Sequence, residues 1–438
     1  MVTTWTNWAG DESCTPARYL QPRSVAEVAA AVQEAAAAGR TVRVVGAGHS
    51  FSDLVCTDGL LLNLDHLSGI RHVDAAAGLI TVGAGTRLYD LNSALASAGL
   101  ALANLGDIDR QSIAGATATA THGTGRLLGN LATQIEAVDL VLADGSSLSC
   151  TDADPEVLSA ARVSLGALGV ATGYRLRVVP AFALHAQIRT MASAELTARL
   201  DELVDGNDHF EFFFFPHADT ALTKRNNRTD EPLRPPGESA QRVVEFLENR
   251  VVEAASRIGR RFPARIPTLN RAVTRLMTSG DYVDESYKVF ASRRSVRFTE
   301  MEMAVPRAAC ADVLAAIQHT IRTRGFEVNF PIEVRFVAAD EKAFLSPSYG
   351  RETAYLAVHM YRGMAWRPYF RAVQDIALAH GGRPHWGKRH LLAADQLADR
   401  YPAWDRFQAV RARLDPRGVF TNEHVRRVLG PVADVGSG

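Results

Sequence analysis

One histidine lies inside a glycine-containing turn that follows an apolar strand. Residues 44–53 read VVGAGHSFSD, so His49 follows Gly46 and Gly48. Small residues in such a turn let backbone N–H groups approach a phosphate closely. Phe51 occupies the position of the third glycine of a G-x-G-x-x-G fingerprint, so the turn is a weak indication of a nicotinamide site. Taken alone, His49 could simply be a turn residue that tolerates unusual backbone angles.

A second stretch of small residues lies between 104 and 125. Nearly every side chain from 112 to 125 is small, and the stretch ends in Thr121-His122-Gly123-Thr124-Gly125. An ordinary helix or strand would bury little apolar surface with such residues. The composition therefore favours close approach of the backbone to something large and flat, and a bound cofactor is the simplest candidate.

A carboxylate and a guanidinium alternate with apolar residues in one predicted strand. Within residues 332–336, Glu333 and Arg335 share one face. His359 is expected on the next strand, so the three groups could converge, bind sugar hydroxyls and polarise one of them for oxidation. The alternatives are a solvated ion pair at a sheet edge, which contributes little, and a histidine with a structural role.

The block His385-Trp386-Gly387-Lys388-Arg389-His390 contains two histidines five positions apart. This spacing does not place both on one helix face, and no carboxylate accompanies them as in H-E-x-x-H, so no metal site is predicted. The alternative is a rigid turn that presents Lys388 as a fixed cation near a developing negative charge.

The composition excludes several classes of protein. A chain of 438 residues predicts two domains or one domain with a large insert. Lys plus Arg and Asp plus Glu both number 48, so bulk charge favours neither a nucleic acid nor an anionic membrane as partner. The four cysteines form no C-x-x-C pair, which indicates a reducing compartment. Without a long apolar run or a leader-like start, the sequence predicts a cytoplasmic protein with no membrane span.

Helices and strands are expected to alternate through the first 180 residues. Ser24, with Glu27 three positions later, predicts a capped helix over 24–38. Thr86 is the expected cap of a second helix over 86–98. The turn Asp144-Gly145 is typical of a hairpin. Strands are predicted at 41–45, 60–64, 79–82, 135–142 and 173–179.

From about residue 181 the composition changes, which predicts a second domain. The aromatic run 210–215 favours a strand, and Pro232, Pro235 and Pro236 indicate a long loop. Further strands are predicted at 297–305, 332–336 and 355–361, with a helix over 307–323 and another that ends near Leu414.

Four motifs, in this order along the chain, resemble the sugar-lactone branch of the vanillyl-alcohol-oxidase-type flavoproteins. They lie at residues 45–51, 106–125, 331–336 and 383–388. That branch contains gulonolactone, galactonolactone and arabinonolactone oxidases and dehydrogenases, with the alditol oxidases as near relatives. The resemblance extends over practically the whole chain.

The resemblance implies an α+β fold with two domains, in which a PCMH-type FAD-binding domain is covered by a cap with an antiparallel sheet. Residues 1–178 would form the FAD-binding domain, 179–400 the substrate (cap) domain, and 401–438 a C-terminal return to the FAD-binding domain. The cofactor would be FAD, joined covalently through His49 to the flavin 8α-methyl group. The residues implied to bind FAD are Val45, Gly46, Ala47, Gly48, His49, Ser50, Phe51, Gly106, Asp107, Ser112, Gly115, Thr119, Ala120, Thr121, His122, Gly123, Val170 and Lys388.

The resemblance also implies hydride transfer from a carbinol C–H to flavin N5. The catalytic residues would be Glu333, Arg335, His359 and Lys388, with His359 matching a proposed base. Lys388 would stabilise the anionic reduced flavin or the incipient alkoxide.

The substrate implied is a sugar-1,4-lactone of the L-gulono-1,4-lactone type, bound by Asp107, Glu333, Arg335, Tyr361 and Lys388. Asp107 replaces a serine of the alditol oxidases and Tyr361 a threonine, which favours a ring over a linear polyol. Oxidation of an alditol, a nucleoside or another sugar alcohol with release of H2O2 is the alternative, and a flavin-binding protein without turnover is a third. Reduced flavin would pass its electrons to O2 or to an acceptor such as a cytochrome or a quinone.

Overall fold

The N-terminal part of the chain folds around two sheets. The computed structural model describes residues 4–277, 279–292 and 295–432. A parallel sheet of three strands has the order β3 (Arg18–Leu20), β5 (Leu60–Asn63), β4 (Val42–Val45). An antiparallel sheet of five strands has the order β10 (Ser147–Cys150), β9 (Ile135–Val141), β11 (Val170–Arg177), β7 (Leu79–Gly83), β6 (Ile70–Asp74).

Two helix caps were predicted in this part of the chain, and one of them is correct. Helix α1 (Val25–Ala37) begins where predicted, because the Ser24 hydroxyl accepts a hydrogen bond from the Glu27 N–H. Helix α2 (Leu88–Ser97) begins after Arg87, so the predicted Thr86 cap is wrong. The Thr86 hydroxyl instead donates to the Gly83 carbonyl and accepts from the Gly69 N–H, which uses it in a sheet connection.

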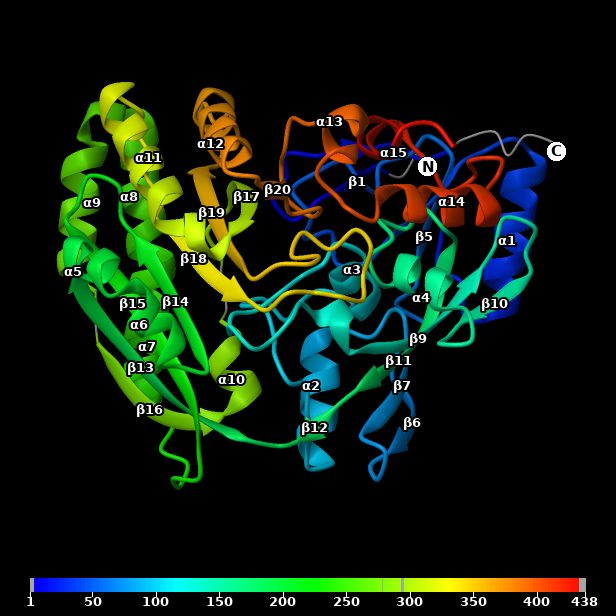
Figure 1. The fold of residues 1–438 in the computed structure, drawn as a ribbon, viewed down its shortest axis with the longest axis horizontal. Helices are drawn as coiled ribbons and strands as arrows, with labels where there is room; N and C mark the ends of the chain where they lie inside the picture. Colours follow the sequence, from blue (N-terminus) through cyan, green and yellow to red (C-terminus); the bar gives the residue numbers. More distant parts are fainter. Residues whose placement is uncertain (1–3, 278, 293–294, 433–438) are drawn as a thin grey trace.

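The part of the chain between residues 183 and 384 contributes all strands of an eight-stranded sheet (Figure 1). Every neighbouring pair in it is antiparallel. The aromatic run and the three predicted strands lie side by side in its middle, which confirms those predictions. The strand order is β16 (Gly280–Glu285), β13 (Ala183–Ala192), β15 (Thr220–Thr229), β14 (His209–Phe214), β18 (Ile332–Val337), β19 (Thr353–Tyr361), β17 (Phe298–Pro306), β20 (Arg383–Pro384).

One face of this sheet is apolar and carries two long helices. Helices α11 (Cys310–Thr323) and α12 (Arg367–Ala379) pack on it, and Figure 1 shows them above the strands. Their buried side chains join Met303, Val334 and Leu356 in one hydrophobic core. The opposite face therefore remains for polar groups.

The proline-rich loop is shorter than the sequence predicted, because helices follow it directly. These are α7 (Glu238–Phe246), the π-helical turn η2 (Leu247–Val251), α8 (Val252–Arg261) and α9 (Ile266–Arg275). Helices α8 and α9 form a hairpin that lies at the end of the molecule far from α1 (Figure 1).

The end of the chain packs against the N-terminal part. Helices α13 (Ala394–Ala398), α14 (Trp404–Leu414) and α15 (Glu423–Leu429) lie beside it in Figure 1. The hydrophobic core of that part also contains Phe344, Trp386 and Leu392, which the sequence placed in the cap range. The boundaries at 178/179 and 400/401 stay predictions.

The remaining elements are β1 (Trp5–Thr6), β2 (Ser13–Cys14), β8 (Leu100–Ala101), α3 (Ile113–Ala118), η1 (Leu131–Gln134), α4 (Pro155–Arg162), β12 (Val179–Pro180), α5 (Ser193–Ala198), α6 (Leu200–Asp205), η3 (Pro263–Arg265), α10 (Ser286–Phe290) and η4 (Arg307–Ala309).

Among the described residues, none of the helices has the length and apolar character needed to cross a membrane. The four cysteines are free thiols.

Candidate active site

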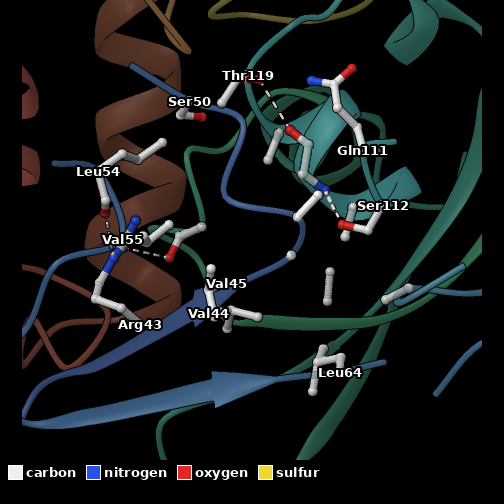
Figure 2. Close-up of a pocket in the computed structure, with 18 of the residues that line it drawn as sticks. Arg43, Val44, Val45, Ser50, Leu54, Val55, Leu64, Gln111, Ser112 and Thr119 are labelled. Carbon is white, nitrogen blue, oxygen red and sulfur yellow. Dashed lines mark hydrogen bonds between the residues drawn. The ribbon is translucent and has the colours of Figure 1, made fainter. Parts of the chain in front are cut away.

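The glycine turn after β4 and the start of α3 line one cavity, shown in Figure 2 with Val45, Ser50, Ser112 and Thr119 around it. Half of the residues predicted to bind FAD line this cavity. They are Val45, Gly46, Ala47, Gly48, His49, Ser50, Ser112, Gly115 and Thr119.

Free backbone donors concentrate in the turn of residues 46–50. None of the five N–H groups of that turn donates a hydrogen bond to a described residue. By contrast, the first N–H groups of α3 are occupied, because those of Ile113 and Ala114 donate to backbone carbonyls and that of Gly115 donates to the Ser112 hydroxyl. A row of free N–H groups beside a cavity fits the pyrophosphate of a dinucleotide such as FAD.

At positions 46 and 123 a side chain larger than that of glycine does not fit, because another segment of the chain packs directly against the backbone there. A Cβ at Gly46 would collide with the Ser112 hydroxyl, and a Cβ at Gly123 would collide with the Leu105 carbonyl oxygen. Ala120, between these segments, has φ 59°, a left-handed conformation that side chains other than glycine adopt at a cost. Close backbone packing therefore explains the small residues between 112 and 125.

The turn is held from both sides. The Trp8 N–H donates to the Gly48 carbonyl at 2.8 Å, and the Trp8 ring stacks on His49 with 5.5 Å between ring centroids. On the other side, the Phe51 N–H donates to the Gly387 carbonyl at 2.8 Å. Burial, reinforced by the positive charge of Lys388, lowers the pKa of His49 to about 4. The imidazole is therefore neutral at pH 7, the state in which a ring nitrogen can form a bond to an electrophile.

The remaining residues predicted to bind FAD lie around the cavity rather than in its wall. Phe51 packs against Phe298, and Val170 is buried in the core between two residues, Gly169 and Ala171, that line the cavity. The others lie on the crossing segments or near the eight-stranded sheet. They are Gly106, Asp107, Ala120, Thr121, His122, Gly123 and Lys388.

The polar face of the eight-stranded sheet carries the predicted catalytic residues. Directly opposed residues of antiparallel strands point to the same face, and Arg335 opposes Glu211 while Glu300 opposes His359. Glu333 and Arg335 are only 4% and 8% exposed and lie on a central strand. The alternative of a solvated pair at a sheet edge is therefore wrong.

Arg335 is surrounded by carboxylates. Its Nε donates to Glu211 at 3.0 Å, and its Nη2 lies 3.2 Å from Asp107 and also contacts Glu333. Lys224 lies 3.3 Å from the far oxygen of Glu211. Burial alone would lower the pKa of Arg335, but the surrounding carboxylates outweigh it and raise that pKa above its ordinary value. This arrangement holds the guanidinium charged and in one orientation.

Glu300 joins the other two predicted catalytic groups. The Lys388 Nζ donates to one of its oxygens at 2.5 Å, and the His359 Nε2 lies 3.5 Å from the other. Burial would raise the pKa of Glu300, but Lys388 and His359 lower it below the ordinary value. In the described part of the chain, no ion pair links this cluster to Arg335, so the predicted groups form two clusters on one face rather than one trio.

Lys388 also reaches toward the glycine turn, because its Nζ lies 4.9 Å from the centre of the Phe51 ring. Tyr361 is buried, and its hydroxyl donates to Glu253 of α8 at 2.7 Å. The polar face and the cofactor cavity are thus neighbours.

His122, Glu302 and His385 place three potential metal ligands within 4.8 Å of one another, a combination that the sequence did not indicate. Their hydrogen bonds oppose a metal. The His122 Nε2 lies 3.0 Å from Glu302, and the Gly387 N–H donates to the His385 Nδ1, so the other ring nitrogen of neutral His385 carries the proton. The three side chains are better described as a buried polar cluster whose hydrogen bonds are made within the protein.

Sequence reasoning missed Glu211, Lys224, Glu300 and Glu302. The strand 297–305 contained a usable signal, since Glu300 and Glu302 alternate with Met301 and Met303 as Glu333 and Arg335 alternate with apolar neighbours. Glu211 gave a weaker signal because phenylalanines surround it.

The sequence pattern of the D-arabinono-1,4-lactone oxidase family matches residues 174–428. The chain belongs to this family. A pattern described as an FAD binding domain matches residues 16–151 of the same chain. The second match covers the glycine turn and the crossing segments, so this lactone-oxidase-family chain carries its FAD-binding part where the cavity lies.

Named relatives of this family member are similar over nearly their whole lengths. An L-gulono-1,4-lactone dehydrogenase of Mycobacterium tuberculosis is 49% identical over 98% of this chain and 100% of that protein. An L-gulonolactone oxidase of Scyliorhinus torazame is 34% identical over 97% of each chain. Among solved structures, a cholesterol oxidase from B. sterolicum superposes with a TM-score of 0.85 over 98% of this chain and 97% of that chain, at 19% identity. The last likeness shows that the fold is shared and says nothing of the substrate.

Proposed function

We propose that the protein is an FAD-dependent oxidoreductase that oxidises a hydroxyl group of a sugar-1,4-lactone of the L-gulono-1,4-lactone type. The observation that carries the proposal is the face of buried, paired charges next to the turn with free N–H groups. The names of the M. tuberculosis and S. torazame relatives support the lactone. Bound FAD would supply the acceptor for a hydride.

His359 is the proposed base, and its hydrogen bonds indicate which atom acts. Its Nδ1 lies 3.2 Å from the Pro331 carbonyl oxygen, which can only accept, so Nδ1 carries a proton. Nε2, which faces the Glu300 carboxylate at 3.5 Å, is then the nitrogen that would take the proton of a substrate hydroxyl. Glu300 would stabilise the imidazolium that results, as a carboxylate beside a catalytic histidine does in other enzymes.

Arg335 and Glu333 are proposed to orient the ring. The guanidinium offers donors to hydroxyl and lactone oxygens, while the Glu333 and Asp107 carboxylates accept hydrogen bonds from hydroxyls. The charge of Lys388 would favour the negative charge that develops as the hydroxyl proton leaves. Tyr361 would close the site from the side of α8.

A panel of sugars tests the substrate. Under anaerobic conditions, L-gulono-1,4-lactone should bleach the flavin absorbance of the purified protein faster than xylitol or adenosine does. Faster bleaching by xylitol or adenosine would favour an oxidase of alditols or nucleosides. Absence of bleaching with every sugar would favour a flavin-binding protein without turnover.

The bond between FAD and His49 is part of the proposal. The neutral state of His49 and its place at the cavity support it. Acid denaturation should leave the yellow colour on the wild-type polypeptide and release it from His49→Ala, which should fold and reduce its flavin more slowly. Colour in the supernatant of the wild type would contradict the bond.

The electron acceptor is proposed to be O2 or a cytochrome or quinone. Admission of air to the anaerobically reduced protein distinguishes them, because rapid reoxidation means oxidase and slow reoxidation means dehydrogenase. The four free thiols support a reducing compartment, which we propose is the cytoplasm.

A further inference from the structure

Exposed apolar side chains concentrate in one segment of the cap. Seven of the ten large hydrophobic residues that are exposed in the described structure lie between positions 233 and 276. Phe246, Ile258, Phe262 and Leu276 are 58%, 45%, 53% and 53% exposed. Scattered exposed apolar residues are ordinary, but a concentration of this kind marks an interaction surface.

The C-terminal part of this segment, which contains most of α8 and all of α9, is strongly basic. Residues 254–280 contain six arginines and no acidic residue, although the whole chain has a net charge of zero. All six arginines are exposed. Arg261, Arg265 and Arg275 form no ion pair with any described residue, so their charges remain available.

The helices present these residues on their outer sides. In α8, Ser256 and Gly259 are buried and face the molecule, while Ile258 and Arg261 are exposed. In α9, Ile266 and Asn270 are buried, and the Asn270 amide donates to the Pro216 and Val328 carbonyls at 2.9 Å. The hairpin is thereby held to the cap by one side.

Arginine and apolar side chains are interleaved on the outer side. The guanidinium carbons of Arg261 and Arg265 lie 5.3 and 5.9 Å from the centre of the Phe262 ring, and Ile258 is one turn away from Phe262. Helices with aromatic and aliphatic side chains among arginines bind at the interface of anionic membranes, where the rings enter the acyl boundary and the cations meet phosphate groups.

From this surface we infer that the protein docks peripherally on an anionic lipid membrane through the α8–α9 hairpin. A second copy of the chain is a poorer occupant, because a two-fold interface through the hairpin would bring two copies of the same basic surface together. The docking surface begins close to the candidate active site, since Val252 of α8 packs against the hydrophobic cluster that contains Phe51 and Tyr361, and Glu253 accepts the hydrogen bond of Tyr361.

Vesicle sedimentation with the purified, flavin-containing full chain tests the inference. The protein should sediment with vesicles that contain phosphatidylglycerol and not with vesicles of phosphatidylcholine alone, and binding should weaken as salt is raised. The variant R261Q/R265Q/R275Q should bind about a hundredfold more weakly, from the usual contribution of basic residues near an anionic surface. The variant I258S/F262S/L276S should lose about tenfold or more because it removes the inserted apolar area.

Matched controls come from residues outside the hairpin. R23Q/R40Q/R417Q removes three exposed arginines elsewhere, and Leu127→Ser removes an apolar side chain that is 73% exposed. Both should bind as the wild type does, and all four variants should keep the wild-type melting temperature and rate of flavin reduction.

Three outcomes would overturn the inference. One is absence of binding to anionic vesicles at low salt. Another is equal loss of binding in hairpin and control variants. The third is a dimer, or a complex with an acidic protein, that forms through the hairpin while vesicles are ignored.

Discussion

Glu300 holds both a candidate base and a candidate cation, which makes it a positioning residue. Its carboxylate lies within 2.5 Å of the Lys388 Nζ and 3.5 Å of the His359 Nε2. Burial works against the charge of Lys388, but Glu300, with smaller contributions from Glu302 and Asp107, outweighs burial and raises the pKa of the lysine. Removal of that carboxylate therefore lowers the pKa of Lys388.

We expect Glu300→Gln to slow flavin reduction roughly ten- to a hundredfold, because neither neighbour is then fixed in place. If the charge of Lys388 is required, the alkaline limb of the rate profile should move to lower pH. Anaerobic stopped-flow across a pH series measures both effects. Glu352→Gln, at an exposed carboxylate that is paired with Arg307, should change neither.

Arg335 depends on the planar fork of its guanidinium. Lysine keeps the charge but cannot face Glu211 with one nitrogen and Asp107 and Glu333 with another. Arg335→Lys should lower kcat/KM about a hundredfold or more, as measured by steady-state assays with the lactone. Arg307→Lys, on the outer side of the cap, is the control and should behave as the wild type.

The sequence showed that polar and apolar residues alternate within single strands. It did not show which charged residues of different strands form ion pairs. Glu333 and Arg335 follow from the period of a strand. Glu211, the partner of Arg335, lies more than a hundred positions earlier, and only the register of β14 against β18 brings the two residues together. Pairing of distant strands leaves no local pattern in a single sequence.

At the scale of elements, local signals predicted strands and one helix cap well. Ser24 caps α1 as expected, whereas Thr86 has a second use in a sheet connection that competes with capping. Helices α7 to α9 were missed, because the prolines before them indicated a loop and the arginines masked their apolar spacing.

The crossing of two backbone segments at Gly123 gives a prediction at this scale. Gly123→Ala should push residues 104–107 away and carry Asp107 with them, since the new Cβ would collide with the Leu105 carbonyl. We expect a lower ratio of flavin to protein absorbance and a loss of about 1–3 kcal/mol of unfolding free energy. Gly237→Ala, where a Cβ meets nothing within 4 Å, should change neither quantity.

For the whole molecule, buried histidines link stability to pH. Burial lowers the pKa of His385 to about 3, and burial also lowers the pKa of His390 well below its ordinary value. Both ring nitrogens of His390 lack a partner among the described residues. The unfolded chain therefore binds more protons than the folded chain between about pH 6.5 and about pH 3.

Stability should be full above about pH 6.5 and should fall as the pH is lowered through that window, by up to about 1.4 kcal/mol per pH unit for each such histidine. Urea unfolding at several pH values measures the slope. His390→Leu should flatten it, and at neutral pH should stabilise the fold by about 1 kcal/mol, because a buried polar ring without a partner is removed. His66→Gln, at an exposed position, should leave the slope as it is.

The eight-stranded sheet has an apolar face in the core and a polar face at the candidate active site, and this limits where substitutions can change the substrate range. Glu211, Glu333 and Arg335 stand on central strands whose opposite sides are locked into the core under α11 and α12. Substitutions at those three positions disturb both the folding of the sheet and the catalytic site, so few of them are tolerated. Asp107 comes from a connecting segment and needs no strand to change. Laboratory evolution toward another sugar should therefore accumulate its first productive substitutions around Asp107, and libraries confined to the strands should yield mostly unfolded proteins.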